Sequence, residues 1–309
     1  MTIWGINALN HDAGIAIMSS GQVTYNKRAS EFSGVAGDHY LNRDIIKDAL
    51  DKGLPDKIVW YENPWLKKTR QLRAGQWRDA FNIKEIPSVY LKSLGLPNYY
   101  IEYASHHGSH AAYALKESGF DHAVVLVADA IGEWDTLSVW LYSDGKLGKL
   151  LSRKYSYSLG LFYSAMTEVA GFVPCKEENR LTELSKQGDW ERYYKQVVEY
   201  ISKNNHCGIW DLEISEKDLP DFAASVQRVF EDQLEYYFKW ANKYSMNIVF
   251  TGGCAFNKQS HHLLPKYFKN TFVPNNPGDG SSALGAIYYN IMPSPYLTDV
   301  YTTTNFLPY

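Results

Sequence analysis

Hydrophobic and polar positions follow the same order twice along the chain. The first series has three short apolar runs, at residues 3–6, 14–18 and 23–25, divided by turns rich in Asn, Asp, Ser and Gly. Short runs with such turns between them predict an antiparallel meander of three strands. After the meander, the apolar spacing predicts a helix near 45–50, strands at 57–61 and 99–104, and a helix at 105–118.

The second series begins near residue 119. The continuous apolar run at 123–127 predicts a strand buried on both faces, and two more strands are expected at 137–141 and 150–156. The remaining pattern predicts a strand at 247–250 and helices at 160–170, 190–202, 220–244, 255–264 and 280–292. We therefore expect an α/β fold of two related lobes, 1–118 and 119–292, with a cleft between them and an irregular tail at 293–309.

Composition narrows the class of protein. The chain has 309 residues, enough for a sizeable core, and its 31 Lys and Arg nearly balance 34 Asp and Glu, so no overall charge attracts it to nucleic acid or to a membrane. Its apolar runs are too short to cross a bilayer, and its start does not resemble a secretion signal. Cys175, Cys207 and Cys254 are too far apart for a CxxC metal site. A cytoplasmic protein with reduced thiols is expected.

Two histidines and two aspartates are candidate metal ligands. His106 and His110 are four residues apart in a predicted helix, so both rings leave one face and can share an ion. Asp129 follows the buried strand, and Asp279 precedes the last predicted helix. Two imidazoles and two carboxylates suit a divalent first-row metal such as iron, manganese or zinc. The alternative is a surface or capping pair of histidines beside ordinary turn or N-cap aspartates.

Two glycine-containing turns are candidates for binding a nucleotide. Gly252 and Gly253 lie between a predicted strand and a helix, where exposed amides and a helix N-terminus favour an anion. Gly132 and Glu133 form a similar turn in the acidic segment after Asp129. Each pair taken alone is also consistent with an ordinary turn.

His11 and Asp12 stand at the first turn between strands. A histidine next to a carboxylate can act as a general base near neutral pH, and a solvated turn histidine is the equal alternative.

A basic segment at 67–78 has a tryptophan near each end. It contains Lys67, Lys68, Arg70, Arg73 and Arg78, with Trp65 and Trp77. This combination of basic and aromatic residues is found on protein surfaces that bind nucleic acid. A solvated helix face is the commoner explanation, and the acidic net charge of the chain favours it.

Taken in order, the motifs resemble those of the NodU/CmcH family of O-carbamoyltransferases. The matching segments are Gly5-Ile6-Asn7, His11-Asp12-Ala13, His106 to His110, Ala128-Asp129, Gly132-Glu133, Ser158-Leu159-Gly160, Thr251-Gly252-Gly253 with Asn257, and Gly278-Asp279. They cover nearly the whole chain and correspond to the family's N-terminal domain, which is similar to TsaD-type tRNA-modification ATPases. The resemblance implies two actin/Hsp70-like (RNase H-like) lobes with a nucleotide and a metal in the cleft between them.

The resemblance also implies an activity. Such enzymes make carbamoyl-adenylate from carbamoyl phosphate and ATP in a C-terminal YrdC-like domain, and the carbamoyl group then passes to an acceptor hydroxyl. By motif, His106, His110, Asp129 and Asp279 would bind the metal, with iron expected and manganese, magnesium or zinc as alternatives. His11, beside Asp12, would be the catalytic histidine near the acceptor. Gly252, Gly253 and Asn257 would lie along ATP or carbamoyl-adenylate.

The family's acceptors include sugars, antibiotics and hydroxymethylcytosine in DNA. Because the matching motifs end near residue 292, we expect the YrdC-like domain to be absent from this chain, and a separate YrdC-like domain or protein is then a candidate partner. A homodimer is an alternative partner arrangement. The competing functions are a non-catalytic nucleotide-binding subunit that needs a YrdC-like partner, and a tRNA threonylcarbamoylation enzyme. The second fits less well, because the turn at 5–13 follows the carbamoyltransferase version.

Overall fold

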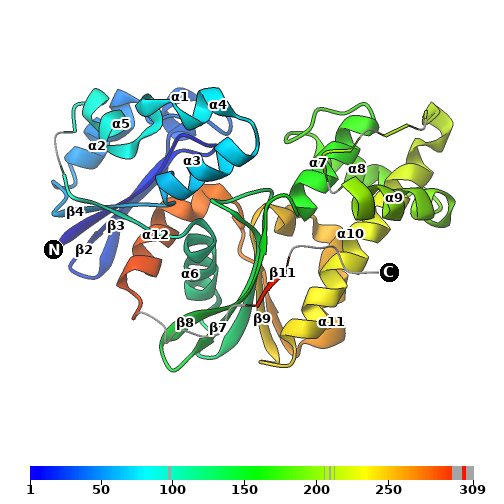
Figure 1. The fold of residues 1–309 in the computed structure, drawn as a ribbon. Coiled ribbons are helices and arrows are strands. Elements are labelled where there is room, and N and C mark those ends of the chain that lie inside the picture. Colours follow the sequence, from blue (N-terminus) through cyan, green and yellow to red (C-terminus); the bar gives the residue numbers. More distant parts are fainter. Residues whose placement is uncertain (97–98, 205, 209, 212, 294–300, 304–309) are drawn as a thin grey trace.

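Two sheets, one from each series of strands, organise the molecule (Figure 1). The computed structural model describes residues 1–96, 99–204, 206–208, 210–211, 213–293 and 301–303. The first sheet has the order β3-β2-β1-β4-β5, with β1 (Thr2–Asn7), β2 (Gly14–Ser19), β3 (Gln22–Arg28), β4 (Lys57–Trp60) and β5 (Ile101–Tyr103). The predicted meander is confirmed, because β1, β2 and β3 pair antiparallel, and β4 and β5 extend the sheet with parallel pairing.

The second sheet repeats this arrangement. Its order is β10-β9-β6-β7-β8-β11, with β6 (Ala123–Ala128), β7 (Asp135–Ser143), β8 (Lys146–Lys154), β9 (Asn247–Thr251), β10 (Asn270–Phe272) and β11 (Tyr301–Thr303). β6, β7 and β8 form the second antiparallel meander, and β9 is parallel to β6. The prediction that β6 is buried on both faces is confirmed, since Val124 and Leu126 pack into one core cluster and Val125 and Val127 into another.

Helices cover both sheets. The first series contributes α1 (Ser30–Ser33), α2 (Arg43–Leu50), α3 (Pro64–Arg73), α4 (Trp77–Ala80) and α5 (Pro87–Ser93). The long connection between β8 and β9 contributes α7 (Leu159–Val169), α8 (Glu178–Ser185), α9 (Glu191–Asn204) and α10 (Leu219–Ala241), which gather on one side of the second sheet (Figure 1). The apolar stripe of α10 packs against α7, α8 and α9 and against the residues of β6 that face them.

Two helices lie together between the sheets. α6 (His106–Ser118) packs on β6 and β9 of the second sheet, and α12 (Ser282–Ile291) packs on β1 and β2 of the first sheet (Figure 1). The two helices contact each other closely, because a Cβ atom on Gly285 would lie 2.2 Å from the carbonyl oxygen of Ser109. The closing helix of the second series therefore belongs to the core of the first sheet. The lobe boundary near residue 119 stays a prediction.

Several elements differ from the prediction. The tail is not irregular throughout, because β11 pairs in parallel with the outer edge of β8 and satisfies backbone groups that an edge strand would leave open. The predicted helix at 255–264 is instead two 3₁₀ segments, η3 (Gly253–Phe256) and η4 (Lys258–Leu263), followed by the short α11 (Leu264–Tyr267). Helix α8 and strand β10 were not predicted. Among the described residues, no helix is both long and apolar enough to span a membrane.

The close approach of α6 and α12 generates a stability prediction. Gly285→Ala should lower the free energy of unfolding by about 1–3 kcal/mol, because the new methyl group has to displace the backbone of α6. Denaturant unfolding measures the change, with Lys116→Ala on the exposed side of α6 as the control, expected to stay within about 0.5 kcal/mol of the wild type. Equal midpoints for Gly285→Ala and the wild type would show that the two helices are not packed as described.

Candidate metal centre

The first turn of α6 presents two imidazoles to the space between the lobes. Ser105 caps the helix, with its hydroxyl oxygen accepting a hydrogen bond from the Gly108 amide at 3.3 Å. His106 and His110 lie one turn apart on the same face, as the spacing predicts, and both are buried. Their Nε2 atoms are 3.2 Å apart.

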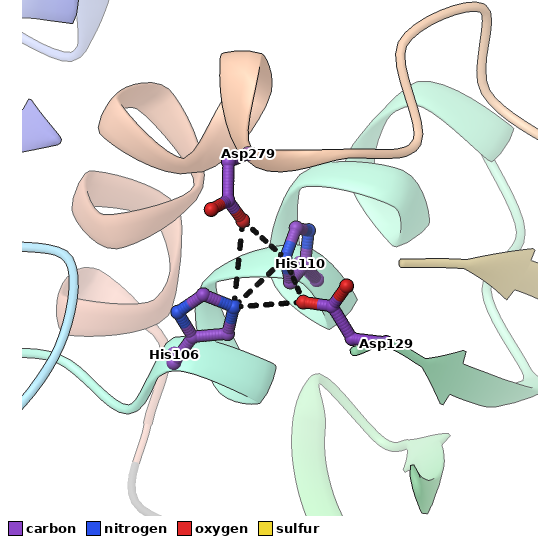
Figure 2. A group of neighbouring side chains, drawn as sticks. All are labelled: His106, His110, Asp129 and Asp279. Carbon is purple, nitrogen blue, oxygen red and sulfur yellow. Dashed lines mark hydrogen bonds and ion pairs between the residues drawn. The ribbon is translucent and has the colours of Figure 1, made fainter. Parts of the chain in front are cut away.

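The two aspartates arrive from other elements. Asp129 follows β6 directly, and Asp279 begins the 3₁₀ segment η5 (Asp279–Ser281) that leads into α12. His106 Nε2 lies 3.0 Å from Asp129 Oδ2, and His110 Nε2 lies 3.0 Å from Asp279 Oδ1 (Figure 2). The crossed pairs are 3.4 and 3.5 Å apart. The structure therefore brings together all four predicted ligands, with one donor atom of each within 4.8 Å of the others.

These separations fit a metal ion. Bonds of about 2.0–2.2 Å from a divalent ion to N and O ligands place neighbouring ligand atoms about 3.0–3.5 Å apart in octahedral or tetrahedral geometry. The four closest N–O separations and the N–N separation all lie between 3.0 and 3.5 Å. Two Nε2 atoms that face each other cannot both donate a proton without repulsion, whereas both can donate a lone pair to one cation. The donor set and its spacing thus suit a divalent first-row ion.

The charges of the cluster also require a counterion. Two buried carboxylates need compensation, which in the absence of a metal comes from the histidines. Burial lowers the pKa of His110, but hydrogen bonds to Asp129 and Asp279 outweigh this and raise it to about 10. Burial raises the pKa of Asp279, but the charge of His106 and the hydrogen bond to His110 lower it to about 2. A divalent cation would replace these protons.

The remaining carboxylate oxygens are held by other groups. Asp129 Oδ1 accepts from the Ala130 amide at 2.8 Å and from the Gly253 amide at 3.2 Å. Asp279 Oδ2 accepts from Asn10 Nδ2 at 2.9 Å. Each carboxylate is therefore oriented to offer one oxygen to the centre. The sequence analysis did not identify Asn10 as a site residue. The only signal in the sequence was its position in the polar turn at residues 7–12.

His11 and Asp12 lie beside the centre. His11 Nδ1 is 2.9 Å from Asp12 Oδ2, and its Nε2 is 3.5 Å from Asp279 Oδ2. The hydrogen bond to Asp12 raises the pKa of His11 to about 9. The buried Asn7 side chain donates to the carbonyl oxygens of Asp12 and Asp279 and so ties this turn to the start of α12. The His11 side chain is 54% exposed, so a ligand in solution can reach it.

Gly132 and Glu133 have different surroundings in the β6–β7 turn. Gly132 lies against the His106 ring, where a Cβ atom would be 2.9 Å from the ring carbon Cδ2. Glu133 is buried, and its Oε1 accepts the Asn63 amide at 2.6 Å. Burial raises the pKa of Glu133 to about 7.

The glycines at 252 and 253 support the centre through their backbone. The Gly252 amide donates to the Pro277 carbonyl at 2.9 Å, and the Gly253 amide donates to Asp129. Gly252 has a φ of +89°, and a Cβ atom there would lie 2.3 Å from the Ala128 carbonyl oxygen, so only glycine fits. The expectation that these two amides are exposed to an anion is therefore wrong, because both donate within the chain. Nucleotide contact at these positions stays a prediction.

Asn257 lies farther along the second lobe. Its side chain exchanges hydrogen bonds with Gln227 and caps η4 by accepting a hydrogen bond from the Ser260 amide.

The three cysteines are free, as expected.

The basic segment forms α3 and α4. Lys67 pairs with Glu62 at 2.7 Å, Lys68 donates to the carbonyls of Asp79 and Asn82, and Arg70 donates to the carbonyl of Glu133 at 3.3 Å. Three of its five cations thus serve contacts within the chain, which favours a structural role for them. Contact with nucleic acid stays a prediction.

Removing one imidazole tests the metal centre. His106→Ala should lower the metal content of the purified protein severely, because an incomplete ligand set holds the ion weakly. Elemental analysis measures the change, and His122→Ala, at an exposed histidine at the opposite end of β6 from Asp129, should retain the wild-type content. A metal content of His106→Ala equal to that of the wild type would contradict the assignment of His106 as a metal ligand.

The buried carboxyl of Glu133 generates a pH prediction. A carboxyl whose pKa rises from 4.5 to about 7 on folding contributes stability that is fully present below pH 4.5 and lost as the pH rises through 7. The Glu133→Gln variant cannot ionise at this position, so its free energy of unfolding does not fall with pH for this reason. The difference between the free energies of unfolding of the variant and the wild type should therefore increase, in favour of the variant, by about 3 kcal/mol between pH 4.5 and 8. Denaturant unfolding across this range measures it, with the exposed Glu183→Gln as the control. A difference that does not change with pH would contradict the burial of an ionisable carboxyl.

The sequence is similar to known proteins along most of its length. Residues 67–207 match the family described as carbamoyltransferase N-terminus. An uncharacterized protein of Methanocaldococcus jannaschii is 30% identical over 298 residues, which cover 89% of this chain and 55% of that protein. Nodulation protein NolNO of Sinorhizobium fredii is 24% identical over 208 residues, which cover 60% of this chain and 30% of that protein. The chain spans about half the length of the curated relatives that it matches along most of its own length.

Solved structures show the same fold. HypF of T. kodakarensis has a TM-score of 0.55 and 11% identity, with 94% of this chain and 47% of that chain covered. The activator of 2-hydroxyisocaproyl-CoA dehydratase from Clostridium difficile, solved with bound ADPNP, has a TM-score of 0.50 and 12% identity, with 94% of each chain covered. The fold is therefore the two-lobed α/β fold of the actin/Hsp70 kind, and residues 67–207 of the chain are similar to the carbamoyltransferase N-terminus family.

Proposed function

We propose that this chain transfers a carbamoyl group from carbamoyl-adenylate, made from carbamoyl phosphate and ATP, to the hydroxyl of an acceptor. The observation that carries the proposal is the buried His–Asp centre with a solvent-accessible histidine at its edge, in a chain whose residues 67–207 match the carbamoyltransferase N-terminus family. An oriented imidazole beside a Lewis-acid site suits acyl-type transfer to a hydroxyl.

His106, His110, Asp129 and Asp279 would hold the metal, for which iron, manganese, magnesium and zinc are the candidates. A bound ion would supply Lewis-acid polarisation of phosphate or carbamoyl oxygens. The work of this chain's own residues is to fix the ligand atoms: Asn10 holds the outer oxygen of Asp279, and the backbone amide of Gly253 holds that of Asp129.

His11 would take the proton of the acceptor. In the proposed step the acceptor oxygen forms a bond to the carbamoyl carbon, and the bond from that carbon to the adenylate phosphate oxygen breaks. AMP leaves with that electron pair, and the hydroxyl proton passes to His11. Asp12 at Nδ1 leaves Nε2 facing the centre and stabilises the imidazolium that forms. The negative charge of Asp279 contributes to the raised pKa of His11, so a cation bound at Asp279 would lower that pKa.

The nucleotide is proposed to lie in the second lobe, along Gly252, Gly253 and Asn257 and near the turn with Gly132 and Glu133. Support comes from the fold, since the dehydratase activator of similar structure was solved with bound ADPNP. A YrdC-like domain or protein is the proposed source of carbamoyl-adenylate.

The proton acceptor can be tested separately from binding. His11→Asn should lower kcat by about 100- to 10,000-fold while metal content and nucleotide affinity stay at wild-type levels, because an amide of similar size cannot accept the proton. The assay supplies preformed carbamoyl-adenylate and candidate hydroxyl acceptors, and a carbamoyl mass gain measures transfer. His122→Asn is the matched control. Near wild-type turnover of His11→Asn would reduce His11 to a turn residue.

A further inference from the structure

A cavity lies beside the metal centre. Its volume is about 730 Å³, and its lining comes from the start of α3, the β5–α6 connection, the β6–β7 turn, β8 and α12. It shares two segments with the centre: Ser105 caps the helix that carries His106, and Glu133 follows the glycine that packs on the His106 ring. A ligand here would therefore contact the same turn that presents Asp129.

Two lysines and two carboxylates line this cavity. Asp135 is buried at its floor, where it accepts from Lys149 Nζ at 2.6 Å and from Ser152 Oγ at 2.7 Å, and it also pairs with Lys154 Nζ. One carboxylate thus holds two ammonium groups, and Arg70 lies against the Glu133 carbonyl behind the wall. Of the two lining carboxylates, Asp135 takes both lysines, while Glu133 accepts from the Asn63 amide.

The ammonium groups are more accessible than the carboxylate that holds them. The Asp135 side chain is 5% exposed, while those of Lys149 and Lys154 are 22% and 39% exposed. Because the carboxylate is nearly buried and the ammonium groups are partly exposed, a further anion meets the lysines first. Lysine binds phosphate as a point charge with three donors.

The walls are suited to a ring. The indole of Trp134 and the phenols of Tyr103, Tyr155 and Tyr289 line the cavity, and all four are partly exposed. The Trp134 indole donates to Thr69 Oγ1 at 3.1 Å, which fixes the plane of that wall. Flat aromatic faces with charged donors between them accommodate an organic ring that carries an anionic group.

We propose that this cavity binds an organic phosphate with a ring, such as a sugar phosphate or a nucleotide, as the hydroxyl acceptor of the chain. The role as acceptor rests on the proposed function, whereas the binding itself does not. The phosphate would contact Lys149 and Lys154, and the ring would lie among the aromatic walls.

Calorimetry on the full chain, without ATP or donor, tests the binding. The probes are glucose 6-phosphate, glucose and inorganic phosphate. Glucose 6-phosphate should bind at least tenfold more tightly than glucose, and more tightly than inorganic phosphate, because charge and ring both contribute. Lys154→Gln should weaken glucose 6-phosphate about tenfold, Lys154→Arg should restore most of the affinity, and Lys239→Gln on α10 should leave it unchanged.

Each outcome decides one claim. Equal affinity for glucose and glucose 6-phosphate, or Lys154→Gln binding as tightly as Lys239→Gln, would overturn the site. If Lys154→Gln fails to fold, the site is still tested by the affinity of Lys154→Arg for glucose 6-phosphate relative to the wild type, and by the relative affinities of the wild type for the three probes. Binding without any carbamoyl transfer to glucose 6-phosphate or to a nucleotide would keep the site and reject the acceptor role. Transfer to neutral acceptors alone would overturn that role while the proposed function stands.

Discussion

The burial of two carboxylates against two imidazoles is the constraint on which the arrangement of the lobes depends. Asp129 and Asp279 cannot lie within 3.5 Å of His106 and His110 inside the protein unless positive charge balances them. The four side chains come from α6, from the residue after β6 and from η5 before α12, which are distinct segments of the sequence. A shared cation, or shared protons in its absence, therefore joins both sheets at one point.

Close backbone packing makes this convergence feasible. Gly285 lets α12 approach α6, Gly132 lets the β6–β7 turn lie on the His106 ring, and Gly253 places an amide on Asp129. A side chain at any of these positions would push one ligand away from the others. The glycine-rich turns, whose composition alone suggests phosphate binding, thus have a first role in holding the ligand atoms in place.

The sequence was enough to predict the two meanders, the buried β6 and the four candidate ligands that the structure brings together, because each leaves a local signal. A spacing of four places His106 and His110 on one helix face, and a carboxylate after a buried strand points Asp129 to the cleft. Contacts between distant segments leave no such signal. The bond from Asn10 to Asp279, the pairing of β11 with β8, and the use of the Gly252 amide by Pro277 depend on tertiary packing.

Anomalous diffraction from crystals of the purified protein, collected on either side of the absorption edge of the metal it contains, tests the centre most directly. The predicted result is one peak about 2.0–2.2 Å from His106 Nε2, His110 Nε2, Asp129 Oδ2 and Asp279 Oδ1. A map in which these four side chains bond to one another around no peak, or in which the metal is bound by other residues, would contradict it.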